Sequence, residues 1–344
     1  MLIIRPVQSG DLEALVDLAS QSGGGLTTLP TSKQALSERI ARSGRSFGGQ
    51  AGKPGEALYF LVLEETEKGQ LVGTSAVYAE VGVKDPFYNY KLLHLTQMSH
   101  DPEVRVECTL LTLANDYAGC SELGTLYLRP DHRKAGIGRV LSRSRYLLIG
   151  AWPELFAETV IAELRGWVDQ AGESPFWDAI GRHFFRMSFA EADKINGRGN
   201  SQFIADMMPK FPIYTNLLSS EAQEVIGKPH VNTAAAMRIL ETEGFKYRGA
   251  VDIFDGGPVL EARRDQIKSV RAYREATLGR LEKGDNWPEL LVANIDIKNF
   301  RVAATPARLA ADGQSLSLPA DTAAALRLEK GDKVGYLEPN GVAA

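Results

Sequence analysis

Apolar residues in this chain follow two spacings, and the first of them is helical. Between residues 11 and 21 they recur every three or four positions, at Leu12, Leu15, Val16 and Ala19, which predicts a helix with one buried face. Segment 232–245 has the same spacing and contains Gly244, a residue suited to the C-terminal cap of a helix. Further helices are predicted at 32–43, from about 138 to 150, and at 175–185, where Ser174 and Pro175 suit a helix start.

The second spacing is that of β-strands, in which apolar residues alternate with polar ones or form short runs. The segments 57–65 and 70–82 flank the charged turn TEKG, which predicts a β-hairpin. Further strands are expected at 2–7, 103–114, 122–129 and 159–168. Because strands and helices are mixed along the first 260 residues, the chain is expected to have a mixed α/β fold.

The pattern changes near residue 261. Residues 1–260 are expected to form one domain, with an irregular insertion at about 190–230 that contains several Pro and Gly residues. Beyond it, segments such as ELLVANIDI alternate like short strands, with one short helix among them. We therefore place a small, β-barrel-like domain at 261–344.

The overall composition narrows the classes of partner. The chain has 344 residues, 44% of them hydrophobic, so it can bury a large core, and its net charge of -4 does not favour a nucleic-acid partner or an anionic membrane surface. The longest apolar run, at 146–152, is far shorter than the roughly 20 residues of a membrane span, and the N-terminus does not resemble a signal peptide. We expect a cytoplasmic protein without a membrane partner.

Cysteine chemistry is not expected to contribute. Cys108 and Cys120 have neither the spacing of a metal site nor the number of a disulfide framework. Neither has a base nearby in the sequence that would make it a nucleophile. We interpret both as small core residues and predict no metal site.

The most informative segment is RPDHRKAGIGR, residues 129–139, between a predicted strand and a predicted helix. The first amides of a helix have no partner within it and attract anions, and glycines let the backbone approach a phosphate closely. Arg133 and Lys134 add positive charge beside the glycines. These features predict a pyrophosphate site formed by six residues: Arg133, Lys134, Gly136, Ile137, Gly138 and Arg139.

A simpler interpretation of the same segment is an ordinary turn, eased by glycine and surrounded by solvated basic residues. The spacing differs from the GxxxxGK[ST] loop of P-loop proteins and lacks the third glycine of the dinucleotide-binding fingerprint. The preceding strand and the following amphipathic helix favour the phosphate site over the ordinary turn.

The succession of strand, R-x-x-G-x-G and helix resembles the acyl-CoA-binding motif of the GCN5-related N-acyltransferases. The resemblance implies that family's fold, with the loop amides holding the pyrophosphate of CoA. The segment NTAAAMRILETEGF resembles a later helix of the family, in which a tyrosine often protonates the departing thiolate. Here Leu240 stands in that position and cannot donate a proton.

A closer resemblance covers nearly the whole chain. Its matching segments, in order, are GGGLTTLP, DPFYNY, SEL-x-TLYL, AE-x-RG, SPFW…FF, FIA-x-MMPK-x-PIY, VIGKPH and IFDGGP. They resemble the arginine N-succinyltransferase family, including its beta-subunit form. The resemblance implies transfer of the succinyl group of succinyl-CoA to the α-amino group of L-arginine, or of ornithine, as the first step of a bacterial arginine degradation route. It implies succinyl-CoA as a co-substrate, no tightly bound cofactor and no covalent acyl-enzyme.

Two site residues follow from this resemblance. The family assigns contact with the acyl-CoA to the leucine of SEL-x-TL, here Leu126, and its proton donor to the histidine of VIG-x-x-H, here His230. Imidazole titrates near pH 6.5, so it can give or take a proton near neutrality. The alternatives are a core role for the Leu126 side chain and a capping or surface role for His230, which precedes a predicted helix.

The charged ends of the two substrates require further residues. A guanidinium binds a carboxylate through two parallel hydrogen bonds, so we assign the succinyl carboxylate to Arg165, which is expected to lie inside a strand. An ion pair between Arg165 and Glu163 or Asp169 is the structural alternative. For the guanidinium of the acceptor we select Asp169 among four carboxylates at strand ends or in turns, namely Asp169, Glu173, Asp252 and Asp255.

Two other functions stay open at this point. The chain could be a non-catalytic or regulatory partner of a related succinyltransferase chain, or an N-acetyltransferase that uses acetyl-CoA on another amine. The first alternative predicts a heteromer with a related subunit, whereas the enzyme could also be a homo-oligomer. Only the acyl pocket distinguishes succinyl-CoA from acetyl-CoA, because both carry the same CoA.

Overall fold

The computed structural model describes residues 1–338 except 23–27, 53, 134–135, 197–202 and 204–205. Contacts divide the chain into two compact units, each built from segments that are distant in the sequence. The first unit comprises residues 1–79, 123–158 and 263–344, and the second comprises 80–122 and 159–262. The C-terminal residues from 263 onward therefore share a unit with the N-terminal 79 residues.

The first unit contains a sheet in which N-terminal and C-terminal strands are neighbours. Its strands are β1 (Leu2–Pro6), β2 (Leu58–Glu65), β3 (Gln70–Tyr78), β6 (Ser121–Leu128), β11 (Arg274–Leu281), β12 (Glu289–Asn294), β13 (Val302–Pro306), β14 (Arg308–Leu309), β15 (Ser315–Leu318) and β16 (Lys333–Leu337). The first two residues of β6 belong to the second unit, and the strand belongs to the first unit from Leu123 onward. Their order is β14-β15-β11-β16-β12-β13-β1-β2-β3-β6. The predicted hairpin is confirmed, since β2 and β3 pair antiparallel.

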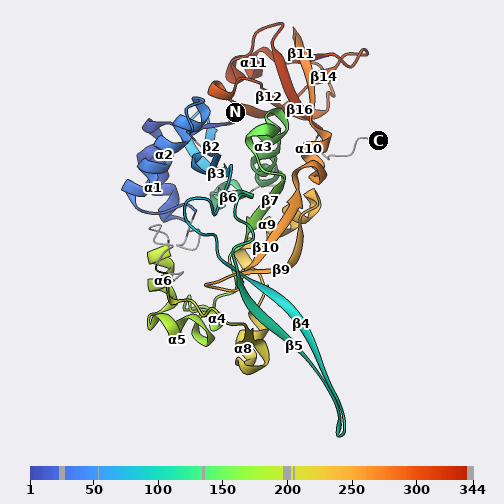
Figure 1. Cartoon of the computed structure of the whole chain (residues 1–344). Helices are drawn as coiled ribbons and strands as arrows, with labels where there is room; N and C mark the ends of the chain where they lie inside the picture. The colour runs from blue at the N-terminus through green and yellow to red at the C-terminus, as the bar shows by residue number, and fades with distance from the viewer. Residues whose placement is uncertain (23–27, 53, 134–135, 197–202, 204–205, 339–344) are drawn as a thin grey trace. The chain divides into compact units, whose positions relative to one another are not determined.

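Five α-helices belong to the first unit: α1 (Leu12–Ser20), α2 (Lys33–Phe47), α3 (Ile137–Ala151), α10 (Lys268–Ala272) and α11 (Ala320–Leu326). The helices α1 and α2 lie on one side of β2 and β3, and α3 lies on the other side (Figure 1). The Ser32 side chain caps α2 by accepting from the Ala35 N–H. In α3 every residue from 141 to 149 is buried, so the burial extends beyond the apolar stripe that the sequence predicts and includes Arg143 and Arg145.

The second unit combines a smaller sheet with short helices. Its strands follow the order β7 (Thr159–Glu163), β10 (Pro258–Arg263), β9 (Lys246–Asp252), β4 (Asn89–His100), β5 (Glu103–Ala114) and β8 (Ile213–Tyr214). Its α-helices are α4 (Pro175–Ala179), α5 (Gly181–Phe185), α6 (Phe189–Asn196), α8 (Ser220–Val225) and α9 (Ala234–Glu243). Aromatic side chains fill its core, where the ring of Trp177 stacks on Phe254 with centroids 5.6 Å apart.

Short 3-10 helices connect these elements: η1 (Ser9–Asp11), η2 (Pro54–Glu56), η3 (Pro130–His132), η4 (Pro153–Leu155), η5 (Thr215–Leu217), η6 (Val231–Thr233), η7 (Arg264–Gln266) and η8 (Ile297–Asn299). Within the described residues, no helix is long and apolar enough to cross a bilayer.

Three expected elements differ from the structure. The strand expected at 159–168 ends at Glu163, so the prediction that Arg165 lies inside a strand is wrong. The helix expected at 175–185 is divided into α4 and α5, because Ile180 leaves the helical region with φ -125°. Strand β4 has no counterpart among the predicted elements.

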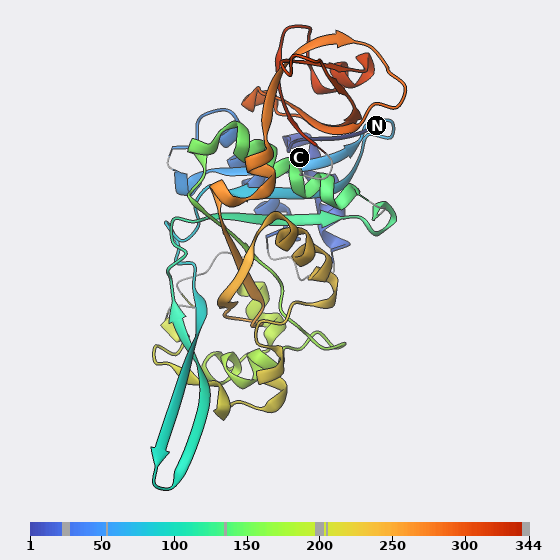
Figure 2. The same cartoon turned by 90° about the vertical axis from the view of Figure 1, so that its right-hand side faces the viewer.

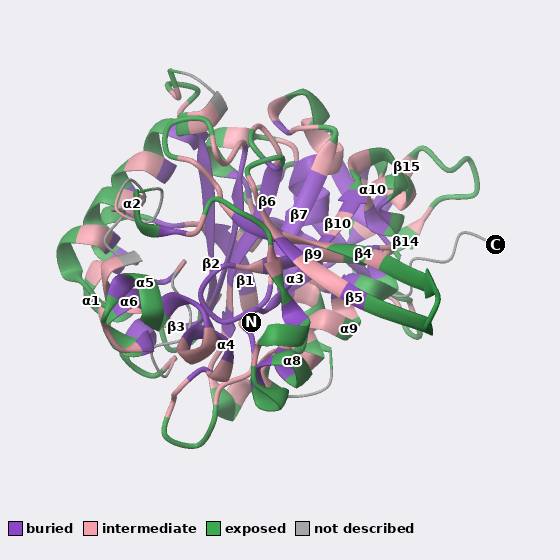
Figure 3. Cartoon of the chain, turned by 60° about the horizontal axis from the view of Figure 1, so that its bottom comes forward, coloured by how far each residue is buried: buried purple, intermediate pink, exposed green. Residues whose placement is uncertain are grey.

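Strands β4 and β5 form a long two-stranded ribbon whose outer part is exposed (Figures 2 and 3). Opposed residues of an antiparallel pair share a face. One face carries Leu93, Leu95, Gln97, Ser99, Val104, Val106, Cys108 and Leu110, whereas the other carries His94, Thr96, Met98, His100, Glu103, Arg105, Glu107 and Thr109. The ribbon is therefore amphipathic, with Leu93, Val104 and Val106 exposed on its apolar face.

Candidate active site

The predicted phosphate loop lies in the first unit, between β6 and α3, as the sequence indicates. Gly136 is the N-cap of α3 and has φ +94°, a backbone conformation that residues other than glycine rarely adopt. A Cβ added at Gly136 would have no heavy atom within 4 Å, and one at Gly138 would meet only Leu128, at 4.0 Å. The backbone at both glycines is thus open to a ligand, and Ile137, Gly138 and Arg139 form the first turn of the helix. Lys134 lies outside the described residues.

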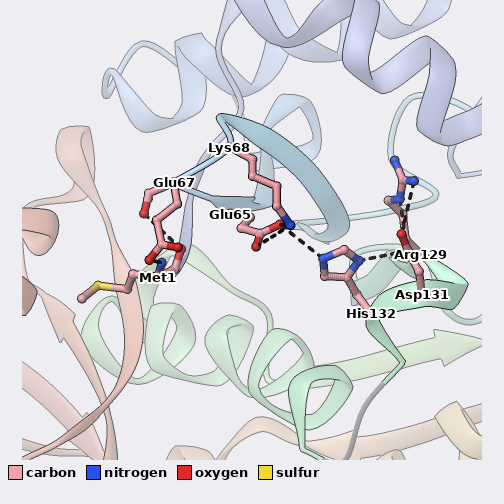
Figure 4. A network of polar contacts seen from close by, with 8 residues as sticks. Met1, Glu65, Glu67, Lys68, Arg129, Asp131 and His132 are labelled. Carbon is pink, nitrogen blue, oxygen red and sulfur yellow. Dashed lines mark hydrogen bonds and ion pairs between the residues drawn. The ribbon is translucent and has the colours of Figure 1, made fainter.

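The start of the loop is held by a chain of polar contacts (Figure 4). The Asp131 carboxylate accepts from the Arg129 guanidinium at 3.2 Å and lies 2.9 Å from His132 Nδ1. On its other side, His132 Nε2 lies 3.5 Å from the Glu65 carboxylate at the end of β2. The contacts with His132 and Arg129 lower the pKa of Asp131 to about 2. This chain of contacts fixes the loop to the sheet just before its glycines.

Arg133, the next residue, is exposed and contacts the strand before the loop. Its Nε donates to the Leu128 carbonyl at 3.0 Å, and its guanidinium lies 5.9 Å from the centroid of the Tyr127 ring. Arg139 is also exposed. The two cationic side chains flank Gly136 and Gly138, where an anion at the helix start would meet them.

Strand β6 contains an irregular residue immediately before Leu126. Thr125 has φ +57°, which is unusual for a β-branched residue, and its N–H donates to Thr28 Oγ1 at 3.0 Å. Its carbonyl accepts from Thr74 Oγ1 at 2.8 Å. These contacts fix the direction of the main chain at the next residue, the half-buried Leu126. The sequence gives no sign of this conformation, because threonine normally favours regular strands.

His230 lies in the second unit, at the start of η6. Its Nδ1 accepts from the Asn232 backbone N–H at 3.1 Å, so the capping role considered for this residue is present in the structure. A backbone N–H can only donate, so Nδ1 is unprotonated in this arrangement and the neutral ring carries its proton on Nε2. Burial and the nearby Arg165 guanidinium lower the pKa of His230, whereas Asp255 raises it. Together these influences favour the neutral ring.

Arg165 lies beside His230 in the same unit, just after β7. The Arg165 carbonyl accepts from the His230 N–H at 2.8 Å. Its guanidinium lies 5.9 Å from the centroid of the Phe189 ring. In the part of the chain that the structure describes, it forms no ion pair with Glu163 or Asp169, the partners considered from the sequence.

A group of carboxylates surrounds these two residues. Burial and mutual repulsion raise the pKa values of Glu163 and Asp255 well above their usual range, and burial also raises that of Asp252. Burial raises the pKa of Asp193 on α6 to about 6. Clustered acids with raised pKa values are typical of functional sites, although structural networks also show them. Of this group, the sequence marks Asp252 and Asp255 as candidate ligands of the acceptor and Glu163 as a partner considered for Arg165. It does not mark Asp193.

Asp169, the carboxylate selected for the acceptor, occupies a different place in the second unit. It is exposed, and its Oδ1 accepts from the backbone N–H groups of Ala171 and Glu173, which closes a turn. It lines a cavity of about 510 Å³ together with Glu173, Asp178, His183 and Glu221, among others. Glu173 and Asp178 pair there with Arg182. The structure therefore brings His230, Arg165 and Asp255 together, and Asp169 belongs to a separate acidic cavity.

The comparisons with known proteins agree over the full length. The family model described as arginine N-succinyltransferase beta subunit matches residues 2–269, and the model of its C-terminal domain matches residues 274–338. The chain is 44% identical over 333 residues to the arginine N-succinyltransferase subunit beta of Pseudomonas aeruginosa, covering 97% of both chains. It is 45% identical over 336 residues to arginine N-succinyltransferase of Escherichia coli, covering 97% of this chain and 96% of that one.

A solved structure has the same fold. The arginine/ornithine succinyltransferase subunit AI from Pseudomonas aeruginosa superimposes with a TM-score of 0.89 at 34% identity, covering 98% of this chain and 99% of that chain. The mixed α/β fold is thus that of an acyltransferase, as the sequence predicts. The chain belongs to the arginine N-succinyltransferase beta subunit family.

Proposed function

We propose that this protein transfers the succinyl group of succinyl-CoA to the α-amino group of L-arginine, giving N2-succinylarginine and CoA. The observation that supports this most strongly is the identity of 44–45% over 97% of the chain to proteins of that name. Retention of the two motifs that the reaction needs, the glycine loop and His230, favours an active enzyme over a degenerate subunit. Ornithine is a second candidate acceptor, because the structural relative is named for both amino acids.

The glycine loop is proposed to hold the pyrophosphate of succinyl-CoA. The open backbone at Gly136 and Gly138 and the amides of the first turn of α3, which have no partner within the helix, offer donors to an anion. Arg133 and Arg139 supply charge around them, and Lys134 follows Arg133 in the sequence. Succinyl-CoA is then a co-substrate that binds and leaves in each cycle. Leu126 follows the irregular Thr125, and its main-chain N–H is proposed to polarise the thioester carbonyl.

His230 is proposed to act on the leaving group. The neutral amine nitrogen attacks the thioester carbonyl carbon and the C–S bond breaks, while His230 Nε2–H donates a hydrogen bond that stabilises the departing thiolate. The neutral ring keeps this proton, and the sulfur takes a proton that the attacking nitrogen releases. The substrate ammonium loses two protons in the complete reaction. One ends on the CoA thiol and the other passes to solvent. The α-amino group titrates near pH 8, so its deprotonation requires little free energy at neutral pH.

The two charged substrate ends are assigned in the second unit. Arg165 is proposed to bind the succinyl carboxylate, because it is a partly buried guanidinium beside His230. Asp169 stays our assignment for the guanidinium of the acceptor, and the acidic cavity that it lines supports a cationic ligand. We also retain the division into an acyltransferase domain at 1–260 and a β-rich domain at 261–344 as a functional proposal.

We further propose that the chain works as an oligomer, either with copies of itself or with a related subunit. The Pseudomonas aeruginosa relatives are named as subunits. Light scattering of the purified chain during size-exclusion chromatography tests this proposal. A mass equal to the 37.5 kDa of one chain would contradict self-association, and full activity at that mass would exclude a required partner.

The test of the function is CoA release by the purified chain. It is measured with succinyl-CoA or acetyl-CoA, each alone, with L-arginine and with ornithine. Release that requires both succinyl-CoA and an amino acid supports the proposal, and a lower KM identifies the preferred acceptor. Release with acetyl-CoA but not succinyl-CoA would contradict it, as would CoA binding without turnover. His230→Ala is expected to lower kcat by about 100-fold or more.

A further inference from the structure

Asp255 is a buried carboxylate to which the proposed reaction assigns no step, and it lies beside the proposed site. Its side chain is 6% exposed in the loop between β9 and β10. Its two oxygens have separate partners, since Oδ2 accepts from the Gly166 N–H at 2.8 Å and Oδ1 accepts from the Gly257 N–H at 2.9 Å. One carboxylate therefore joins the loop after β7 to the turn before β10.

The peptide group that Asp255 holds through Gly166 is also the one that holds His230. The N–H of the Arg165–Gly166 peptide donates to Asp255, and the C=O of the same peptide accepts from the His230 N–H at 2.8 Å. The Thr233 hydroxyl lies 3.3 Å from the same carbonyl and 2.9 Å from the His230 carbonyl, so its one O–H is shared between the two acceptors. An acceptor on one side of a peptide polarises the group and strengthens the bond accepted on the other side.

The backbone around this peptide is packed too closely for any side chain. A Cβ added at Gly166 would lie 2.3 Å from the Asp255 carbonyl oxygen, and one at Gly257 would lie 2.1 Å from the Leu164 carbonyl oxygen. A third link is the bond from the Gly227 N–H to the Gly256 carbonyl, at 2.8 Å. The three loops that carry Arg165, His230 and Asp255 thus form one hydrogen-bonded assembly with little freedom to shift.

We propose that Asp255 is a positioning residue that orients His230 and Arg165 for acyl transfer by fixing the Arg165–Gly166 peptide. It touches neither the reacting thioester nor the amine in this role. The inference rests on the proposed function of His230, and it adds a residue whose removal displaces both the imidazole that stabilises the leaving thiolate and the carboxylate-binding guanidinium.

The charges around Asp255 support the same role. A negative charge at Asp255 raises the pKa of His230, whereas the Arg165 guanidinium lowers it. The titratable groups around this assembly are Arg165, His230, Glu163 on β7, Asp193 on α6 and Asp252 on β9. Glu122 on β6 acts indirectly, because its charge raises the pKa of Glu163. A change at Asp255 is therefore expected to alter the titration of His230.

Two substitutions in the same loop separate geometry from charge. In Asp255→Asn only one side-chain oxygen remains, so the NH2 group must face one of the two N–H donors. In the control Asp252→Asn the two bonds from the backbone survive, because the same oxygen, Oδ1 of Asp252, accepts from the N–H groups of both Phe254 and Asp255. This substitution changes the charge beside Asp255 and keeps the backbone geometry of the loop. Thr233→Val provides a milder probe at the other side of the Arg165–Gly166 peptide, in case Asp255→Asn does not fold.

The experiment combines kinetics with NMR titration of His230, one of five histidines in the chain, whose signal is assigned by its loss in His230→Ala. Asp255→Asn is expected to lower kcat by about 10- to 100-fold, with the KM for succinyl-CoA within twofold of the wild-type value. It is also expected to lower the pKa of His230. Asp252→Asn removes a charge that is coupled to Asp255, so it is expected to shift the His230 titration with a smaller loss of kcat than Asp255→Asn. Asp255→Glu is expected to restore part of the kcat that Asp255→Asn loses.

Unchanged kcat and an unchanged His230 titration in folded Asp255→Asn would overturn the inference. The same holds if Asp255→Asn lowers the thermal stability and changes neither kcat nor the His230 titration. If Asp255→Asn does not fold, an unchanged kcat in Thr233→Val would have the same meaning. If the wild-type chain does not turn over any acceptor, the proposed function fails. The His230 titration in Asp255→Asn still tests the positioning in that case, because it requires no substrate.

Discussion

Thr28 and Thr125 hold each other through two reciprocal hydrogen bonds. The Thr125 N–H donates to Thr28 Oγ1 at 3.0 Å, and Thr125 Oγ1 donates to the Thr28 carbonyl at 3.1 Å. The pair stabilises Thr125 at φ +57°, and Thr125 in turn sets the direction of the main chain at Leu126. Thr28 is fixed further by the Arg39 guanidinium, which donates to its carbonyl.

Thr28→Val should therefore reduce both stability and activity. Without Thr28 Oγ1, the Thr125 N–H loses its acceptor, at a cost of about 1–3 kcal/mol in the free energy of unfolding. Urea denaturation and kcat measurements check this. In the background of Thr125→Gly, where the positive φ carries no strain, the same substitution should cost less. An equal cost in both backgrounds would mean that Thr28 does not support the conformation of Thr125.

Gly136 and Gly138 should respond differently to alanine. Gly136→Ala forces a side chain into φ +94°, so it should lower stability by about 1 kcal/mol and weaken CoA binding. Gly138→Ala adds a Cβ that meets only Leu128, so the fold should tolerate it, and only the approach of the pyrophosphate should suffer. Calorimetric titration with CoA and thermal melts separate the two effects. Undiminished CoA affinity in Gly138→Ala would contradict close contact between phosphate and backbone there.

The pH dependence of kcat/KM should show two groups on its acid side. Substrate with a neutral amine becomes scarce below about pH 8, and neutral His230 becomes scarce only below its own pKa, which lies under the usual value of about 6.5. Log kcat/KM should therefore rise with a slope of about two below the His230 pKa and about one above it. In His230→Gln, which keeps an N–H donor but does not titrate, the steeper portion should disappear. A steeper portion that persists would assign the second group to another residue.

Asp193→Asn should stabilise the protein at high pH and not at low pH. Burial raises the pKa of Asp193 to about 6, so the folded state binds its proton more tightly than the unfolded state does. Stability is then lost as the pH rises from about 4 to about 6, by at most about 3 kcal/mol, since each pKa unit corresponds to about 1.4 kcal/mol. Asparagine removes this loss. Thermal melts of the wild type and of Asp193→Asn at pH 5 and pH 8 check the prediction. A difference in Tm between the two proteins that is the same at both pH values contradicts it.

The outer part of the β4–β5 ribbon should exchange its amide hydrogens rapidly. Among the described residues, β4 beyond Lys91 and β5 before Leu110 pair only with each other. An isolated two-stranded ribbon is marginally stable in water. Hydrogen exchange measured by mass spectrometry should show little protection in residues 93–109 and strong protection in β2 and β3. Strong protection of the ribbon in the purified protein would mean that another surface covers it.

The local elements were largely predictable from the sequence because the residues that start and stop them act locally. Ser174 caps the helix that it was expected to cap, and Gly244 ends α9 in the left-handed conformation. The hairpin of β2 and β3 and the helix after the glycine loop also follow from spacing alone. Family resemblance added His230 and Leu126, which no spacing distinguishes from ordinary residues.

The surroundings of the site were not predictable, because they depend on contacts between distant segments. Arg165 leaves the strand because the chain turns at Gly166 to meet Asp255, 89 residues later. Thr125 adopts a positive φ because of Thr28, 97 residues earlier. Gly257 is required by the Leu164 carbonyl in another loop. Each of these features is a close approach of two backbones, and one sequence contains no direct signal of such an approach.

Strand β1 has a partner on each side, and this has a consequence for any attempt to shorten the chain. Ile4 pairs with Val302 of β13, and the residues of β1 also pair with β2 from Leu2↔Glu65 to Pro6↔Leu61. Ile3 packs in the same core as Leu290, Leu316 and Val334 of the C-terminal segment. Truncation after residue 262 would leave β1 as an unprotected sheet edge beside exposed apolar surface, a combination that promotes aggregation. The C-terminal segment therefore also protects the N-terminal strand from aggregation, because it covers the edge of β1 and the apolar surface beside it.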